Sequence, residues 1–304
     1  MGVKRRIARI RANQFAQGAG KVSLSTLGID EVINPEDVTV TTLAHMVETP
    51  GTIEAADFCG GAVVMRAFRV EADCPLAGRR LATLRGEKGV PPFLVAAVKR
   101  GNSILIPDGN FNLQVEDVCY VFTLSRDIEK FIAQYDLRRQ TTGRVAVFGA
   151  TRFGRALCAR LEKSVSNLLL IEPDADAARA AAESLTNTLV IHGSAADPDL
   201  MEENHVCDSD YFLATSDDDQ SNLMAALLAR KIGSRYVLMV ASQTEYMSIV
   251  SGLDLDSVVN PLILSVGAIL RLVRRGRVLS LAKVGGDQAE VMVVEVAESA
   301  PARG

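Results

Sequence analysis

Apolar runs and helical stretches alternate through the second half of the chain. The apolar runs are continuous, which is typical of strands that are buried on both faces of a parallel sheet. They cover residues 144–149, 167–174, 188–193, 210–215 and 236–241. Strands that alternate with helices in this way predict a Rossmann-like α/β unit.

One of the intervening helices carries signals at both ends. Ser216 is expected to be its N-cap with Asp219 in the capping-box position, and Gly233 is expected to end it. The acidic run Asp217–Asp219 is therefore predicted to be a solvated first turn that complements the helix dipole. A metal site is the weaker interpretation, because no His or Cys accompanies the run at ligand spacing.

A shorter α+β pattern precedes this unit. Residues 62–70 and 117–124 are predicted strands, and residues 93–107 form two apolar runs around Arg-Gly-Asn, a hairpin signal. Residues 75–85 predict a turn that leads into a short helix, and residues 126–135 predict a closing helix. The polar stretch 136–143 is the expected boundary between the two domains.

An internal repeat connects the two ends of the chain. Residues 29–47 match residues 255–273 without a gap, and each copy runs from a strand through Asn-Pro into a helix. Asn34 and Asn260 can cap these helices, while Pro35 and Pro261 suit the first helical position. The match continues upstream, from residues 7–15 to 236–246, and downstream, from residues 68–78 to 294–304.

The repeat predicts an α/β chain of four segments that is cut at both ends. It has one complete Rossmann-like parallel unit and one complete small α+β domain, with a partial copy of each. The expected segments are a remnant of a first Rossmann-like repeat (1–56), the small domain (57–140), the complete Rossmann-like domain (141–278) and the start of a second small domain (279–304).

The candidate chemistry lies in the stretch RVAVFGATRFGRALCARLE, residues 144–162. It predicts a strand that passes through a G-x-G-x-x-G-like turn into a helix, whose N-terminus attracts phosphate. Gly149 and Gly154 occupy the outer glycine positions, but Thr151 stands where a glycine normally lets a pyrophosphate approach. Either the phosphates lie farther out, with the Thr151 hydroxyl donating to them, or the site is closed. Arg152 and Arg155 flank the turn and suit phosphate neutralisation or helix-surface solvation equally.

A second signal is the acidic residue at the end of the next strand. Glu172 lies where a carboxylate accepts hydrogen bonds from both ribose hydroxyls of an adenosine, which disfavours a 2′-phosphate. The alternative is an exposed acid at a strand end, and its position favours the functional interpretation. His192 is interpreted as a structural residue at the end of its strand.

The amino-acid composition excludes some classes of protein but does not indicate a function. The chain of 304 residues is 48% hydrophobic and 23% charged, as expected of a packed globular protein. A formal charge of −4 gives no reason to expect nucleic acid as a partner. The five cysteines are scattered and are expected to be buried, reduced thiols. The longest apolar stretch, residues 258–273, is shorter than the ~20 residues of a spanning helix.

The order of motifs resembles the regulator-of-potassium-conductance (KTN) domain family. The order is the glycine turn, the strand ending in Glu172, and then HGSAAD at 192–197, YFLATSDDDQSN at 211–222 and LDSVVNP at 255–261. The resemblance implies a cytoplasmic, non-enzymatic regulatory subunit of potassium uptake, at the inner face of the cell membrane. Its partner would be a potassium-translocating membrane protein of the Trk type, its ligand NAD(H) or alternatively ATP/ADP, and its assembly a homo-oligomer.

The resemblance also implies a set of binding residues. They are Gly149, Ala150, Thr151, Arg152, Phe153, Gly154, Glu172, Gly193, Ser194 and Thr215. The chain departs from the family pattern at Thr151, in place of the middle glycine, and at Ser194, where the family usually has Asp. No catalytic residue and no metal ligand is predicted.

Two other functions compete with this one. A ligand-free Rossmann module that only assembles is favoured by Thr151 and Ser194. An NAD-dependent oxidoreductase of the short-chain type is disfavoured, because none of the five tyrosines has a Lys four residues further on. The glycine turn of such enzymes also needs glycines where Arg152 and Arg155 stand.

Overall fold

The computed structural model describes residues 6–10, 28–49, 51–101, 103–135, 137, 143–244, 253, 255–273, 278–284 and 289–294. The expected domain boundary at 136–143 lies mostly outside the described residues, as does the downstream end of the repeat beyond residue 294.

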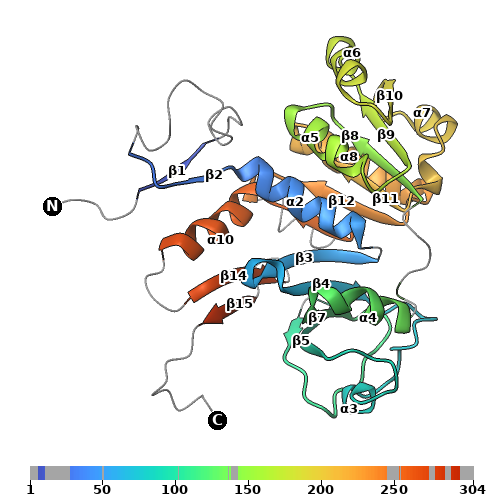
Figure 1. The fold of residues 1–304 in the computed structure, drawn as a ribbon. Coiled ribbons are helices and arrows are strands. Elements are labelled where there is room, and N and C mark those ends of the chain that lie inside the picture. Colours follow the sequence, from blue (N-terminus) through green and yellow to red (C-terminus); the bar gives the residue numbers. More distant parts are fainter. Residues whose placement is uncertain are drawn as a thin grey trace.

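The second half of the chain forms the predicted doubly wound unit (Figure 1). Its six parallel strands lie in the order β10-β9-β8-β11-β12-β13, so the sheet grows outward in both directions from β8 and β11. The elements are β8 (Arg144–Phe148), α5 (Arg152–Leu161), β9 (Asn167–Glu172), α6 (Ala175–Ser184), β10 (Thr188–His192), α7 (Pro198–Glu203), the 3-10 turn Val206–Asp208, β11 (Tyr211–Ala214), α8 (Asp219–Ile232), β12 (Tyr236–Val240), β13 (Ser257–Val259) and α10 (Pro261–Val273).

Both faces of this sheet are covered, which explains the continuous apolar runs. Odd-numbered residues of β8, such as Val145 and Val147, pack toward α5 and α6. Even-numbered residues, such as Ala146 and Phe148, pack toward α7 and α8. The first face is also covered by a helix from the other end of the chain, α2 (Pro35–Glu48), whose Leu43 belongs to the same core.

The small domain is a five-stranded antiparallel sheet in the order β3-β4-β7-β5-β6. Its elements are β3 (Thr52–Phe58), the 3-10 turn Cys59–Gly61, β4 (Val63–Arg69), α3 (Leu81–Leu84), β5 (Phe93–Arg100), β6 (Ser103–Leu105), β7 (Val118–Leu124), the 3-10 turn Ser125–Asp127 and α4 (Ile128–Gln134). The predicted hairpin around residues 100–102 is present as β5 and β6. The expected division between residues 56 and 57 falls inside β3, because that strand pairs with β4 along its whole length.

The structure reproduces the repeat element by element. β1 (Ile7–Arg9) and β2 (Glu31–Ile33) form a parallel pair like that of β12 and β13. β2, α2 and β3 correspond to β13, α10 and β14 (Val278–Val284), and β4 corresponds to β15 (Ala289–Val294), which pairs with β14. The two Asn-Pro caps form as predicted, since Asn34 accepts from the Glu36 N–H and Asn260 from the Leu262 N–H. In Figure 1 the two copies of the helix, α2 and α10, lie beside one another.

The start of α8 differs from the prediction. The N-cap is Asp218, which accepts from the Ser221 N–H, and Ser216 instead bonds to Asn222. Asp219 is buried rather than solvated, and its carboxylate accepts the N–H groups that follow β12. The end of the helix at Gly233 agrees with the prediction.

The cysteines differ in part from the expectation of buried thiols. All five are free, and Cys119 and Cys158 are buried. Cys59, in contrast, is exposed, because it lies in the 3-10 turn between β3 and β4 with a φ of 52°.

Candidate functional site

The glycine turn joins β8 to α5 at the carboxyl edge of the sheet. Gly149 has a φ of 100°, and a Cβ there would lie 2.6 Å from the Ser216 nitrogen. A Cβ at Gly154 would lie 1.9 Å from the Gly149 carbonyl oxygen. Both outer glycines are therefore required by the packing of the turn itself, whether or not a ligand binds.

Thr151, at the middle position, creates no backbone strain. Its φ is −57°, which any residue adopts, and it is the N-cap of α5. Its hydroxyl accepts the Gly154 N–H at 3.0 Å and donates to the Thr215 carbonyl at 3.3 Å. The one hydroxyl proton is thus directed at a backbone carbonyl, so a hydroxyl bond to phosphate would first have to break this contact.

Glu172 lies at the end of β9 and is 7% exposed. One carboxylate oxygen accepts the Ala150 N–H of the glycine turn at 2.5 Å, and the other accepts the Asp174 N–H at 2.8 Å. The alternative of an exposed acid at a strand end is therefore wrong, because the carboxylate is buried and accepts two backbone N–H groups. Each oxygen still has a second lone pair, which can accept a hydrogen bond from a ribose hydroxyl.

Arg152 opens α5 and forms an ion pair across the repeat. Its guanidinium donates to both carboxylate oxygens of Glu36 in α2, with Nη2–Oε1 at 2.6 Å and Nε–Oε2 at 3.1 Å. The Glu36 hydrogen bond raises the pKa of Arg152. Arg155 is half-buried, and its Nε has no hydrogen-bond partner among the described residues.

The remaining predicted residues gather at the same edge. The Gly193 N–H donates to the Glu172 carbonyl, and a Cβ on Gly193 would lie 2.0 Å from Leu200 Cδ1. Ser194 is exposed, and its hydroxyl accepts the Ala196 N–H. Thr215 is buried and donates to the Phe148 carbonyl at 2.8 Å, so it supports the turn from behind.

Sequence reasoning missed one member of this constellation. Glu36 contacts Arg152 although 116 residues separate them. The repeat placed Glu36 in the first turn of a helix, but nothing in the pattern indicated that this helix packs on α5.

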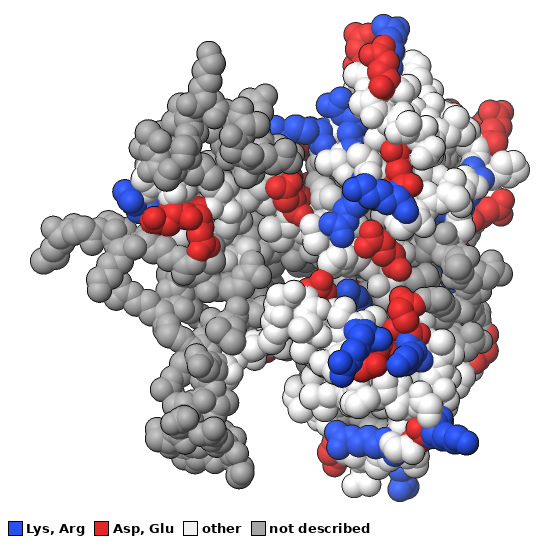
Figure 2. Space-filling model, viewed as in Figure 1, with Lys and Arg blue, Asp and Glu red and all other residues white. Residues whose placement is uncertain are grey.

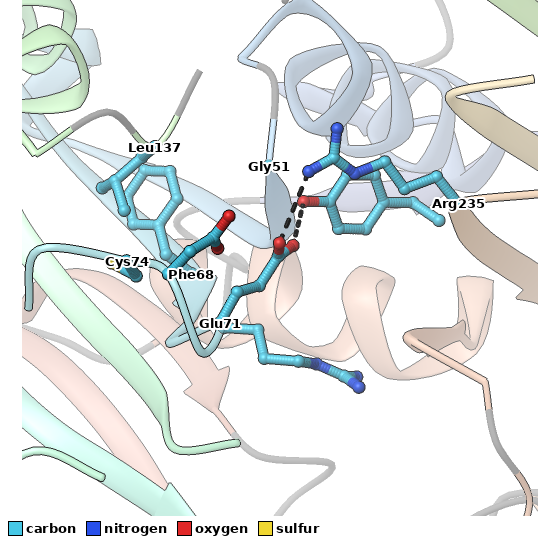
Figure 3. Close-up of a pocket in the computed structure, with 9 residues that line it drawn as sticks. Gly51, Phe68, Glu71, Cys74, Leu137 and Arg235 are labelled. Carbon is cyan, nitrogen blue, oxygen red and sulfur yellow. Dashed lines mark hydrogen bonds and ion pairs between the residues drawn. The ribbon is translucent and has the colours of Figure 1, made fainter. Parts of the chain in front are cut away.

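A second feature is a cavity of about 40 Å³ between the small domain and the Rossmann-like unit (Figure 3). Glu71 enters it and accepts from the Tyr236 hydroxyl at 3.2 Å, with the Arg235 guanidinium 3.5 Å away. The full lining is Gly51, Phe68, Arg69, Glu71, Asp73, Cys74, Leu137, Arg235 and Tyr236. These contacts hold the two domains together.

Surface charge is mixed on the face shown in Figure 2, where acidic and basic groups of the described residues lie interspersed. The described part of the chain has no group of three or more His, Cys, Asp or Glu residues arranged to hold a metal ion. None of its helices combines the length and the apolar character needed to cross a bilayer.

Comparison with known families finds a match in each half of the chain. Residues 145–261 match the TrkA-N domain, and residues 65–135 match the TrkA-C domain. The chain thus contains a TrkA-N and a TrkA-C domain. It is 29% identical over 287 residues to the Trk system potassium uptake protein TrkA of Halomonas elongata, covering 94% of this chain and 63% of that protein. The Vibrio alginolyticus protein of the same name is 26% identical over 288 residues, with the same coverage.

The chain spans less than two thirds of the length of these TrkA relatives. Its fold is shared with the crystal structure of the GsuK RCK domain, at a TM-score of 0.58 and 18% identity over 88% of this chain and 55% of the other. The GsuK channel bound to NAD gives a TM-score of 0.60 at 16% identity, over 88% and 46% of the two chains. The expected TrkA-type resemblance is confirmed, and the matched domains are those of Trk potassium uptake proteins rather than of an enzyme family, as expected.

Proposed function

We propose that this chain is a nucleotide-sensing regulatory component of a potassium-uptake system. Its ligand is NAD(H) or, as the alternative, ATP or ADP, held over the N-terminus of α5. The observation that carries the proposal is the contact between the Glu172 carboxylate and the Ala150 N–H, inside a TrkA-N domain. The contact supports the proposal because the acid expected to bind ribose lies against the turn expected to bind phosphate.

The turn fits such a ligand in two respects. The turn is tight, with no room for a Cβ at Gly149 or Gly154, and α5 directs about half a positive charge at whatever lies above it. Glu172 is fixed by two backbone N–H groups, so its oxygens need little reordering to accept ribose hydroxyls. Thr151 opposes close approach, because its Cβ occupies the middle position, and we therefore expect weaker binding than a G-x-G-x-x-G turn gives.

The names of the relatives support a partner and a location. The relatives are named as potassium uptake proteins of the Trk system. We propose that the whole protein acts in the cytoplasm, peripheral to the inner face of the cell membrane, as a homo-oligomer that docks on a potassium-translocating membrane protein of the Trk type. The bound nucleotide would then gate transport of K⁺.

The test is calorimetric titration of the intact chain with NADH, NAD, ADP and ATP. We expect NAD(H) to bind, and NADP(H) to bind more weakly, because Glu172 repels a 2′-phosphate. Glu172→Ala should abolish or strongly reduce NAD(H) binding and remove the preference over NADP(H). Glu183→Ala is the matched control, since it removes an exposed carboxylate from α6 of the same unit.

The result that would overturn the ribose contact is equal affinity of wild type and Glu172→Ala for NAD(H). Absence of binding by any of the four nucleotides would favour the second candidate, a ligand-free assembly module. That candidate is supported by Thr151, whose hydroxyl is already engaged within the turn.

A further inference from the structure

The helix that borders the nucleotide turn comes from the other repeat. α2 belongs to the first copy, yet it packs on α5 of the second copy, and the apolar side chains Leu43 and Leu157 share one core. In Figure 1 α2 runs between α5 and α10, and it is followed directly by β3 of the small domain. A movement of α2 relative to α5 would therefore act directly on β3 of the small domain.

Polar contacts fix the two ends of this interface differently. Arg160 of α5 contacts Thr41 in the middle of α2 at 3.3 Å and Glu48 at its C-terminal end at 3.7 Å. At the N-terminal end the contact is the two-pronged pair of Arg152 with Glu36. The Arg152 side chain is 53% exposed and the Glu36 side chain 26%, so the pair can be reached from solvent.

Two groups can therefore compete for the Arg152 guanidinium: the Glu36 carboxylate and a nucleotide phosphate. It is the first residue of α5, directly after the N-cap, where a phosphate held over the helix N-terminus would meet it. Its planar fork suits a carboxylate and a phosphate equally well, and its two-pronged contact with Glu36 leaves less of the fork for a phosphate.

We propose that Glu36 is an internal competitor for the nucleotide phosphate at Arg152, so that nucleotide binding releases the N-terminal end of α2 from α5. The inference rests on the proposed function, since it concerns the same nucleotide site. Coupling of this kind is reciprocal: whatever strengthens the Glu36–Arg152 pair weakens nucleotide binding by the same factor. The first repeat would thus sense the ligand of the second.

The experiment is a double-mutant cycle measured as ADP and NADH affinity of the intact chain. Glu36→Gln should tighten binding about two- to five-fold, the range of an exposed ion pair. In the Arg152→Gln background the same Glu36 substitution should have no effect, because the contested group is absent. Asp37→Asn, which removes an exposed charge one position further along α2, should change affinity less than Glu36→Gln.

The possible outcomes separate this inference from the function on which it rests. If Glu36→Gln leaves affinity unchanged while Glu172→Ala abolishes binding, the competition is wrong and the proposed function stands. If Glu36→Gln tightens binding equally with and without Arg152, the effect is long-range charge and the competition is also wrong. If the wild-type chain binds none of NADH, NAD, ADP and ATP, both proposals fail.

Discussion

Replacing Asp217, Asp218 and Asp219 one at a time with alanine should give three different losses of stability. The three residues are chemically identical and adjacent, yet the structure places them in three environments. Asp217 is exposed, Asp218 caps α8, and Asp219 is 6% exposed. Asp219 connects α8 to the loop that follows β12.

The magnitude for Asp219 follows from its hydrogen bonds. Its carboxylate accepts the Ser242 N–H at 2.9 Å and the Gln243 N–H at 2.9 Å. A hydrogen bond to a charged group is worth about 1.5–3 kcal/mol, and part of that is recovered when water reaches the freed N–H groups. We expect Asp219→Ala to lower the free energy of unfolding by about 3 kcal/mol, which lowers the melting temperature by roughly 6–12 °C.

The neighbouring substitutions provide the internal controls. Asp217→Ala should not measurably change the melting temperature, and Asp218→Ala should give an intermediate loss, because it removes an N-cap. Asp219→Asn keeps one acceptor oxygen and should lose less than Asp219→Ala. The assay is a thermal melt of each purified variant followed by circular dichroism at one pH. Equal losses at all three positions, or a larger loss at Asp217 than at Asp219, would refute the assigned environments.

Two further predictions concern the glycine turn and the thiols. Gly154→Ala should lower the free energy of unfolding by about 1–3 kcal/mol, even after the gain in helix propensity, because its Cβ would lie 1.9 Å from a backbone oxygen. Gly109→Ala is the control, since its Cβ would meet only an ordinary 3.5 Å contact, and equal melting temperatures of the two variants would contradict the packing argument. In a timed maleimide labelling experiment Cys59 should react first, being exposed, whereas Cys158 should react only on unfolding, because burial raises the pKa of its thiol. Labelling of Cys158 at the rate of Cys59 in the folded chain would contradict this.

The local structure of the chain was predictable from short stretches of sequence. The Asn-Pro caps at Asn34 and Asn260 form as expected, and so do the glycine turn and the hairpin around residues 100–102. These features depend on residues a few positions apart, where backbone preferences and capping bonds act. The internal repeat was equally visible in the sequence, and the structure pairs β14 with β15 as it pairs β3 with β4, because two copies of one pattern fold alike.

The partners of polar side chains were decided by the tertiary structure. The sequence alone determined that Arg152 opens a helix and that Thr151 replaces a glycine. It did not show that Glu36 reaches Arg152 across 116 residues, or that the Thr151 hydroxyl is held by Gly154 and Thr215. Asp219 was expected to be solvated, but the loop after β12 brings the Ser242 and Gln243 N–H groups to its carboxylate. Polar groups bond to whatever the packed elements bring within about 3 Å, and hydrophobic periodicity specifies which faces are buried but not which distant groups meet there.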